Sequence, residues 1–220
     1  MSEMNIYCLP GNAATDFAGQ FLKEAGICVS HGIHPGVTHV LLPVPTRVQA
    51  ELPPEITVIG GNLSCPGVDL LKDPWYLAEN AAITARCAMD LMGQDLKDLP
   101  VLVLGWGRIG KCLGKSLQKK GAYVTIAARK DPDLAMIDAL GYRAMDLNHL
   151  KLDSQFIINT IPAMVLPQGP ANVYAIELAS KPGMGGENVI IAKGLPGKMR
   201  PAESGRLIAE TFMRLSEVEL

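Results

Sequence analysis

The stretch VLVLGWGRIGKCLG, residues 101–114, constrains the fold of this chain more than any other. An apolar run of strand type leads into Gly105, Gly107 and Gly110, and a helical pattern begins inside this glycine loop. In such a loop the first glycine permits a tight turn, the second lets a phosphate approach the backbone, and the third lets helix and strand pack closely. Free N–H groups at the helix start bind phosphate. The pattern predicts a dinucleotide site, with a plain strand-to-helix turn as the alternative.

Strands and helices alternate through the rest of the C-terminal half. We expect strands at residues 101–105, 122–128, 155–162, 173–180 and 188–194, and helices at 108–121, 131–141 and 201–220. Asp131 and Pro132 are the expected cap and first residue of the middle helix. Such alternation is typical of a parallel sheet that is covered on both faces. The sequence therefore predicts an α/β fold with a Rossmann-type, doubly wound parallel sheet.

A smaller α/β unit precedes this sheet. We expect its strands at residues 5–11, 38–45 and 55–61, and a helix at 16–26 that Asp16 caps. Residues 73–93 carry apolar side chains at helical spacing. The predicted organisation is a small N-terminal α/β domain at 1–78, a connecting helix at 79–98, a Rossmann domain at 99–200, and a C-terminal helix at 201–220 that packs back on the first domain.

Composition and charge exclude several classes of partner. The 220 residues are 48% hydrophobic and carry a net charge of −2, so neither nucleic acid nor a membrane surface is expected as partner. No apolar run reaches the roughly 18 residues that a membrane helix needs. The first residues lack the pattern of an export signal. The five cysteines are scattered and odd in number, which predicts buried, reduced thiols and a cytoplasmic location.

The strand after the glycine loop indicates which dinucleotide is bound. NAD-binding domains place an acidic residue about 20 residues after the loop, where it binds the ribose hydroxyls. Here Ala127 and Ala128 occupy that place, and Arg129 and Lys130 follow. Two cations without a carboxylate suit a 2′-phosphate. We therefore expect NADP in preference to NAD, the alternative being two solvated cations with Asp131 as a displaced acid.

A second strand end completes the predicted cofactor site. The segment NTIPA, residues 159–163, follows a strand of the same sheet, and ligands of such sheets bind at the carboxyl ends of strands. It is expected to edge the nicotinamide, with a strand-ending turn as the alternative. The predicted cofactor-binding residues are Gly105, Trp106, Gly107, Arg108, Ile109, Gly110, Ala128, Arg129, Lys130, Thr160, Ile161 and Pro162.

Several segments together resemble one known family. LPVPT, ENAAIT, GWGRIGK, VTIAARK, NTIPA, LASKPG and GLPGK occur in the order found in the A subunit of dipicolinate synthase, from about residue 40 onward. That family is similar in build to 2-hydroxyacid dehydrogenases, with an N-terminal substrate-side domain and a Rossmann domain. The resemblance implies oxidation of a dihydrodipicolinate-type ring with reduction of NADP during sporulation. The partner that it implies is a flavoprotein-like B subunit.

The chain departs from that family at identifiable positions. Arg86 stands where the family has Glu, Lys193 stands where it usually has Pro, and the connection between LASKPG and NVIIAKG is short. Parallel neighbouring strands normally need a dozen or more residues to cross over. We therefore expect the last strand to be displaced or antiparallel. The same departures leave open a subunit that binds nucleotide but has lost catalysis.

The implied substrate is a small carboxylic acid, which requires cations and hydrogen-bond donors. The candidates are Asn80, Thr84, Arg86, Lys181 and Lys198. The two lysines follow strand ends, whereas Asn80 and Thr84 lie one helical turn apart. Solvated loop charges for the lysines, and capping or packing for Asn80 and Thr84, are the alternatives. No general base stands out, so Lys181 and Thr84 are the catalytic candidates.

The histidines suggest no further chemistry. His31, His34 and His39 lie in a Gly/Pro loop without interleaved Cys, Asp or Glu, and no metal site is predicted. His149 is expected at a helix on the outer face.

Three functions remain open from the sequence. They are an NADP-dependent oxidoreductase of the dipicolinate synthase type, a catalytically reduced nucleotide-binding subunit that acts with a partner chain, and a reductase of another small keto or imino acid. A homodimer is expected by analogy with related builds.

Overall fold

The computed structural model describes residues 4–47, 52–171 and 173–216. The chain divides into two compact units, the first formed by Met1–Ile83 with Pro196–Leu220 and the second by Thr84–Leu195. The division falls inside helix α2 (Pro74–Met92), the segment from which the sequence predicts a connecting helix. Two predictions fall partly outside the described residues. Residues 1–3 belong to the segment in which no export signal is expected, and residues 217–220 are the end of the expected C-terminal helix.

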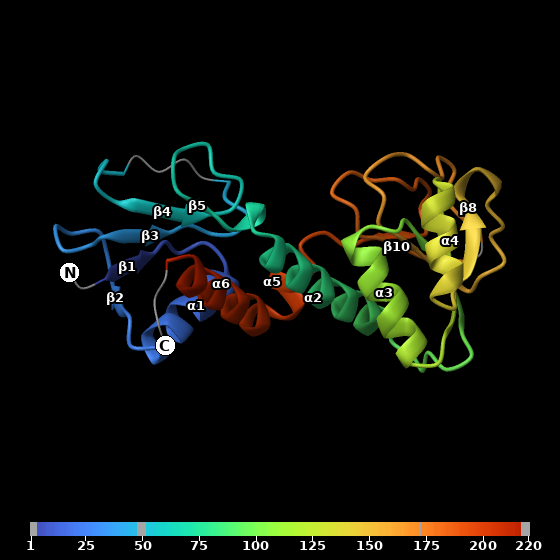
Figure 1. Cartoon of the computed structure of the whole chain (residues 1–220), viewed down its shortest axis with the longest axis horizontal. Coiled ribbons are helices and arrows are strands. Elements are labelled where there is room, and N and C mark those ends of the chain that lie inside the picture. Colours follow the sequence, from blue (N-terminus) through green and yellow to red (C-terminus); the bar gives the residue numbers. More distant parts are fainter. Residues whose placement is uncertain (1–3, 48–51, 172, 217–220) are drawn as a thin grey trace. The chain divides into compact units, whose positions relative to one another are not determined.

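The first unit is built on a five-stranded parallel sheet (Figure 1). In spatial order its strands are β2 (Cys28–Ser30), β1 (Asn5–Cys8), β3 (His39–Leu41), β4 (Thr57–Gly60) and β5 (Val68–Asp69). The sequence patterns do not predict β2 and β5. These strands have three and two residues, which is too short for an apolar alternation to emerge.

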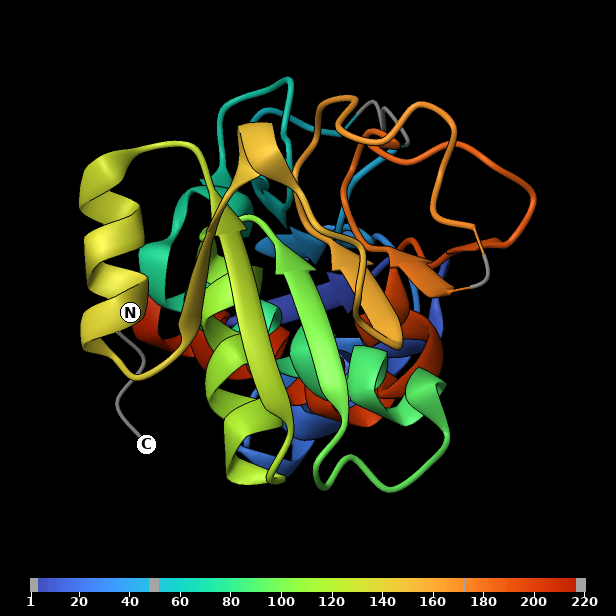
Figure 2. The same cartoon turned by 90° about the vertical axis from the view of Figure 1, so that its right-hand side faces the viewer.

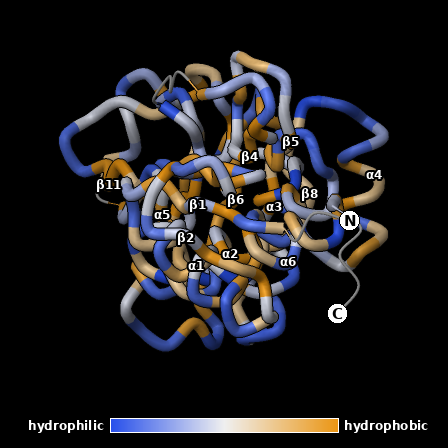
Figure 3. Tube along the Cα trace, turned by 90° about the vertical axis from the view of Figure 1, so that its left-hand side faces the viewer, coloured by the Kyte–Doolittle hydropathy of each residue, from blue (hydrophilic) through white to orange (hydrophobic). Residues whose placement is uncertain are grey.

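Helices α1 (Ala13–Glu24) and α6 (Pro201–Leu215) pack against each other in this unit (Figure 1). The region of Figure 3 that carries the labels α1 and α6 contains both hydrophobic and hydrophilic positions. Leu22 and Phe212 are fully buried in the core that the two helices share. A Cβ atom at Gly205 would lie 2.5 Å from Phe17 Cβ and 2.7 Å from the Ala14 carbonyl oxygen on α1. Glycine at this position therefore lets the two helices approach to backbone contact.

The second unit contains a six-stranded, wholly parallel sheet. In spatial order its strands are β8 (Arg143–Asp146), β7 (Tyr123–Ala128), β6 (Pro100–Leu104), β9 (Phe156–Asn159), β10 (Tyr174–Glu177) and β11 (Val189–Ile191). Counted along the chain from β6, this is the 3-2-1-4-5-6 order of a Rossmann sheet. Strands β7 and β8 extend the sheet on one side of β6, whereas β9, β10 and β11 extend it on the other side. The topological switch point, where the strand order reverses, therefore lies between β6 and β9.

Two helices cover one face of this sheet. Helix α3 (Arg108–Lys119) packs on β6 and β7, and α4 (Asp131–Ala139) packs on β7 and β8. Figure 2 views the sheet from the opposite face, which is crossed by loops. Within the described part of the second unit, loops and Leu147 of a short 3-10 helix pack on that face instead of α-helices. Its core is formed by strand and loop side chains, which include Leu102, Leu104, Ala127, Ile157 and Met184.

The short connection before the last strand does not change its direction. Strand β11 pairs in parallel with β10, with Ala175 opposite Val189 and Glu177 opposite Ile191. The expectation of a displaced or antiparallel strand is therefore wrong. Residues 178–188 make the crossover as a loop without a helix, and backbone bonds such as Gly185 N–H to the Leu166 carbonyl (2.9 Å) hold this loop.

Three predicted details of the helices differ in the structure. Asn12 rather than Asp16 caps α1, because its side chain accepts from the Thr15 N–H at 2.9 Å. Helix α4 begins at Asp131 itself, so Lys130 is its N-cap and supplies no side-chain bond. Lys198 comes after strand β11, as expected, but it lies in the short helix α5 (Leu195–Met199) rather than in a loop.

His149 is exposed at a short helix, as expected, whereas the thiols differ from their prediction. His149 belongs to the short 3-10 helix η2 (Leu147–His149), where Nδ1 lies 2.8 Å from Asp146 Oδ2, and is exposed. None of the five cysteines is in a disulfide bond, but only Cys87 is buried, whereas Cys8 and Cys112 are half-buried and Cys28 and Cys65 are exposed. Among the described helices none is both long and apolar enough to cross a bilayer.

Candidate functional site

The glycine loop joins β6 to α3 at the carboxyl edge of the second sheet. Gly105 has φ +106°, a conformation that favours glycine, and its N–H donates to the Ala127 carbonyl at 2.9 Å. A Cβ atom at Gly105 would lie 2.6 Å from Thr160 Oγ1. At Gly110 a Cβ atom would collide with the Gly105 carbonyl oxygen. These two glycines are therefore required for the close packing of strand, loop and helix.

Gly107 has a different environment. It is the N-cap of α3, no side chain caps the helix there, and a Cβ atom added to it would meet nothing within 4 Å. The first N–H groups of a helix have no partner within the helix and carry a partial positive charge. An exposed helix start without a capping side chain, beside a residue that presents only backbone, can accept a diphosphate.

The loop after β9 lies beside the glycine loop. Both the N–H and the hydroxyl of Thr160 donate to the Leu104 carbonyl, each at 2.9 Å. These bonds fix the chain at the switch point between β6 and β9. Open α/β sheets bind their ligands in the crevice outside such a point.

A cavity of about 300 Å³ occupies this position. The predicted cofactor residues that line it come from three strand ends, and they are Gly105, Trp106, Gly107, Ala128, Arg129, Lys130, Thr160, Ile161 and Pro162. Asp133 and Leu147 complete the lining. The other three predicted residues, Arg108, Ile109 and Gly110, form the first turn of α3 and do not line the cavity.

The charges of this cavity lie at its β7 side. Arg129 and Lys130 follow β7 and are exposed. Asp133, in the first turn of α4, adds a carboxylate that the sequence reading does not include, whereas Asp131 does not line the cavity. A phosphate at this edge would meet two cations and one carboxylate.

Trp106, which lines the cavity, has ring contacts with two other residues. Its ring packs edge-on against Tyr142, with ring centroids 5.9 Å apart, and Lys111 Nζ lies 5.5 Å above the ring centroid. Such cation–π and aromatic contacts orient an indole that would otherwise rotate. Trp106 is therefore an ordered part of the lining and a natural fluorescent reporter of ligand binding.

The sequence reading missed one buried group, Glu177 at the end of β10. Its side chain is fully buried and accepts hydrogen bonds from Asn159 and from three backbone N–H groups. The signal was an ionisable residue inside the apolar run YAIELA. Asn159, predicted at the nicotinamide edge, is also fully buried and faces Glu177 rather than the cavity lining.

The substrate candidates are spread over both units. Asn80 and Lys198 belong to the first unit, and Thr84, Arg86 and Lys181 belong to the second. Thr84 is buried, Asn80 and Arg86 are half-buried with partners of their own, and both lysines are exposed. None of these residues lines the cavity at the glycine loop.

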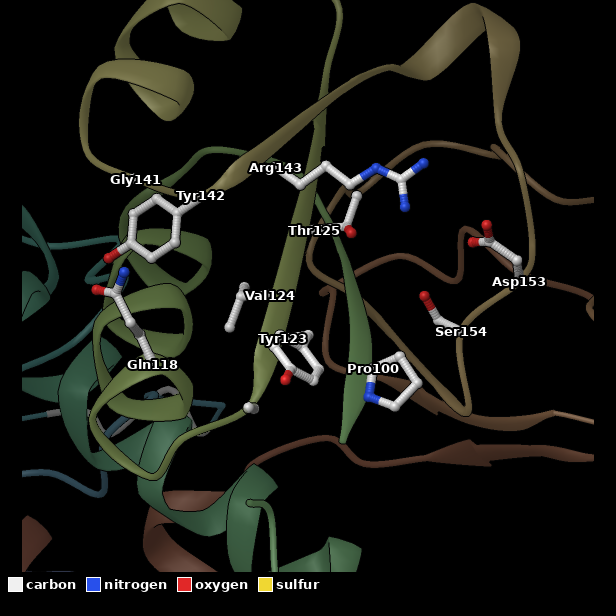
Figure 4. Close-up of a pocket in the computed structure, with 11 residues that line it drawn as sticks. Pro100, Gln118, Tyr123, Val124, Thr125, Gly141, Tyr142, Arg143, Asp153 and Ser154 are labelled. Atoms are coloured by element: carbon white, nitrogen blue, oxygen red, sulfur yellow. The ribbon is translucent and has the colours of Figure 1, made fainter. Parts of the chain in front are cut away.

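A larger cavity of about 580 Å³ lies at the opposite, amino edge of the second sheet (Figure 4). Tyr123 and Arg143, at the starts of β7 and β8, line it together with Asp153 and Ser154. Helix α3 begins at the other edge and presents its free N–H groups there. The smaller cavity is therefore the candidate cofactor site, since helix start, glycine loop and strand carboxyl ends converge on it.

Hydrogen bonds with Gly36 and Ser30 fix the ring of His34 in the predicted histidine loop. The Gly36 N–H donates to His34 Nδ1 at 3.1 Å, so Nε2 carries the proton toward Ser30 Oγ, 3.0 Å away. This tautomer cannot accept a proton from the serine. The described residues contain no group of three or more His, Cys, Asp or Glu side chains arranged for a metal ion.

Burial, assisted by Asp16, raises the pKa of the Cys8 thiol to about 11, which makes this thiol a poor nucleophile.

Comparison with known proteins shows which class of domain this part of the chain resembles. Residues 76–173 match the sequence model of the family described as D-isomer specific 2-hydroxyacid dehydrogenase, NAD binding domain. The matched segment, which covers most of the second unit, is similar to a dehydrogenase-type, NAD-binding domain. The predicted fold class, an α/β fold with a Rossmann-type parallel sheet, is confirmed.

The particular protein that the chain resembles is the A subunit of dipicolinate synthase. The curated relative from Bacillus subtilis is 32% identical over 131 residues, which cover 52% of this chain and 44% of the relative. The match thus spans less than half of that relative's length. The crystal structure of the A subunit of dipicolinate synthase from Bacillus halodurans has a TM-score of 0.81 at 22% identity, covering 100% of this chain and 99% of that one. A transhydrogenase from Sinorhizobium meliloti has a TM-score of 0.68 at 14% identity, covering 96% and 93%. The predicted resemblance is confirmed.

Proposed function

We propose that this chain is an NADP-dependent oxidoreductase that acts on a dihydrodipicolinate-type cyclic dicarboxylate, as the resemblance implies. The coarser part of this statement, a nicotinamide cofactor in a dehydrogenase-type domain, has the support of the family match. The observation that carries the finer part is the set of strand ends around the 300 Å³ cavity, with Arg129 and Lys130 at one side. A 2′-phosphate is the group on the cofactor that two exposed cations would select.

The lining residues fit such a cofactor. Glycine at 107 leaves open space over the free N–H groups of α3, which would bind the diphosphate. Arg129 and Lys130 would bind the 2′-phosphate, and Thr160, Ile161 and Pro162 would border the nicotinamide. When bound, the cofactor supplies the hydride acceptor of an oxidation.

The chain's cations would hold the carboxylates of the substrate. Lys181, Lys198 and Arg86 are the candidates, with Asn80 and Thr84 as hydrogen-bond partners. Thr84 and Lys181 are also the candidates for moving a proton.

The test is a binding titration on a Trp75→Phe background. Trp106 is then the only tryptophan in the chain, and quenching of its fluorescence reports occupancy of the cavity. We expect NADP to bind more tightly than NAD. Arg129→Asp should weaken NADP by about tenfold and leave NAD within a factor of about three, because the lost contact is exposed and charged.

Asp133→Asn is the matched control, since it removes the lining carboxylate instead of a cation. It should strengthen NADP binding modestly. An unchanged preference for NADP in Arg129→Asp would refute the assignment of Arg129. Turnover is tested by the appearance of NADPH when the chain meets a dihydrodipicolinate-type precursor.

A partner chain and a homodimer are part of this proposal. The relative is named as one subunit of a synthase, which supports a complex with a second, B-type chain. The turnover assay is therefore run with and without that chain. Cofactor binding without turnover in both arms would favour a catalytically reduced, nucleotide-binding subunit. Turnover of other small keto or imino acids would favour a different reductase.

A further inference from the structure

The second unit buries a carboxylate that has no cationic partner. The Glu177 side chain has zero exposure, and no Lys, Arg or His lies within ion-pair distance of it in the part of the chain that the structure describes. Burying a charge is costly unless hydrogen bonds replace the lost water. A buried polar group whose hydrogen bonds are all satisfied makes its surroundings rigid, so the partners of Glu177 show which segments it holds in place.

Glu177 accepts five hydrogen bonds, two from Asn159 at the end of β9 and three from the loop after β10. Oε2 accepts from the N–H groups of Gly183 at 2.7 Å and Met184 at 3.0 Å, and Oε1 accepts from the Ala179 N–H at 2.9 Å. The Asn159 amide donates to both carboxylate oxygens, at 2.9 and 3.0 Å. Backbone donors on residues 179–184 thus fold the loop after β10 around one side chain.

Asn159 extends the same network to the loop after β9. Its Nδ2 donates to the Ile161 carbonyl, and its Oδ1 accepts from the Ile161 N–H, both at 3.0 Å. Gly183 fits against this corner because a Cβ atom there would lie 2.5 Å from the Ala163 carbonyl oxygen and 2.8 Å from that of Ile161. The carboxylate therefore sets the ends of β9 and β10 relative to each other.

The outer sides of these two loops carry candidate functional residues. Ile161 and Pro162 line the cavity at the glycine loop, and Lys181 is exposed between the backbone donors at 179 and 183. We propose that Glu177 is a positioning residue: it holds the β9 loop against the nicotinamide half of the cofactor and orients Lys181 toward the substrate. This inference rests on the proposed function.

The test compares Glu177→Gln with the wild-type chain, using two probes. One probe is NADPH, and the other is 2′-phospho-ADP-ribose, which has the adenine half and the diphosphate but no nicotinamide. Gln has the same shape but replaces one acceptor oxygen with an NH₂ group, which faces N–H donors. We expect NADPH binding to weaken about tenfold and 2′-phospho-ADP-ribose binding to change less than about twofold. The fluorescence of bound NADPH should shift toward that of the free form.

Two further variants separate positioning from general stability. Asn159→Asp combined with Glu177→Gln exchanges the carboxylate and the amide, so it should recover part of the NADPH affinity that Glu177→Gln loses. Glu177→Asp keeps the charge but is one methylene shorter, so its NADPH affinity should lie between those of wild type and Glu177→Gln. If Glu177→Gln does not fold, Glu177→Asp replaces it in the comparison of the two probes. Glu187→Gln, at an exposed glutamate of the same connection, is the control without effect.

The outcomes distinguish the two proposals. Equal loss of both probes in a folded Glu177 variant, or no loss of either, would overturn the positioning role alone. A wild-type chain that binds neither probe would overturn the proposed function, and the positioning role with it. Selective loss of NADPH, with partial recovery in the exchanged pair, supports the proposal.

Discussion

Alanine should have different effects at two glycines of the same loop: at Gly107 it should weaken cofactor binding, and at Gly110 it should lower the stability of the fold. Gly107→Ala places a methyl group where nothing lies within 4 Å, and the backbone there (φ −79°, ψ −171°) suits any residue. Gly110→Ala places a methyl group against the Gly105 carbonyl oxygen and 3.6 Å from Thr160 Oγ1. The methyl group at residue 107 therefore enters open space, whereas the methyl group at residue 110 collides with backbone, which cannot rotate away as a side chain could.

The expected magnitudes follow from these contacts. Gly107→Ala should alter the free energy of unfolding by no more than about 0.5 kcal/mol, since it creates no clash and affects only the cap. Its methyl group would displace a diphosphate from the N–H groups of α3, and losing one charge-assisted bond weakens binding by about 10- to 150-fold. Gly110→Ala should destabilise the second unit by about 1–3 kcal/mol through overpacking.

Urea unfolding and the Trp106 titration measure the two effects separately. NADP binding by Gly107→Ala at wild-type affinity would refute the placement of the diphosphate over Gly107. Wild-type stability of Gly110→Ala would refute the account of strand and helix packing. If both variants lose binding and stability together, the distinction between a packing glycine and a ligand glycine does not hold.

Two predictions concern the stability of the first unit. Gly205→Ala should lower the free energy of unfolding by about 1–3 kcal/mol, because its Cβ atom would press on Phe17 and the backbone of α1; Gly197→Ala, where nothing lies within 4 Å, is the matched control in a urea melt. Burial raises the pKa of Asp73, but bonds from the Tyr76 N–H at 2.7 Å and Arg214 at 2.6 Å outweigh burial and lower it overall. A carboxyl group with a lowered pKa stabilises the fold above the ordinary value of about 4, and this contribution is lost as pH falls through the folded pKa. Asp73→Asn should therefore destabilise the chain by roughly 1 kcal/mol at pH 7 and by less at pH 3, and an equal difference at both pH values would contradict this account.

Local patterns in the sequence predicted the glycine loop and the strand ends around it. The turn at Gly105 and the start of α3 depend on residues that are close in sequence, so a motif of six residues contains the needed information. The switch point follows from strand order, which alternation with short connections restricts. Strand β8 was missed because its four residues, RAMD, alternate without a run of β-branched side chains.

Contacts between distant residues were not readable in this way. Glu177 and Asn159 are 18 positions apart, and their bond depends on the parallel register of β9 and β10, which pairs these two residues directly. The sequence signalled only that an ionisable side chain stands in a buried strand. The sequence analysis does not include Asp133, because it places the cap at Asp131. The helix begins at Asp131 itself, and its third residue, Asp133, rather than its first lines the cavity.

The candidate site separates into a part made by the backbone and a part made by side chains. The diphosphate would be bound by N–H groups at the start of α3, and their positions depend on close packing at Gly105 and Gly110. The cofactor's extra phosphate would be selected by Arg129 and Lys130, which are exposed and make no ion pair within the described residues. Changing these cations therefore costs the fold little, whereas changing the packing glycines costs both fold and binding. Cofactor preference is for this reason the property that a single substitution should alter most easily.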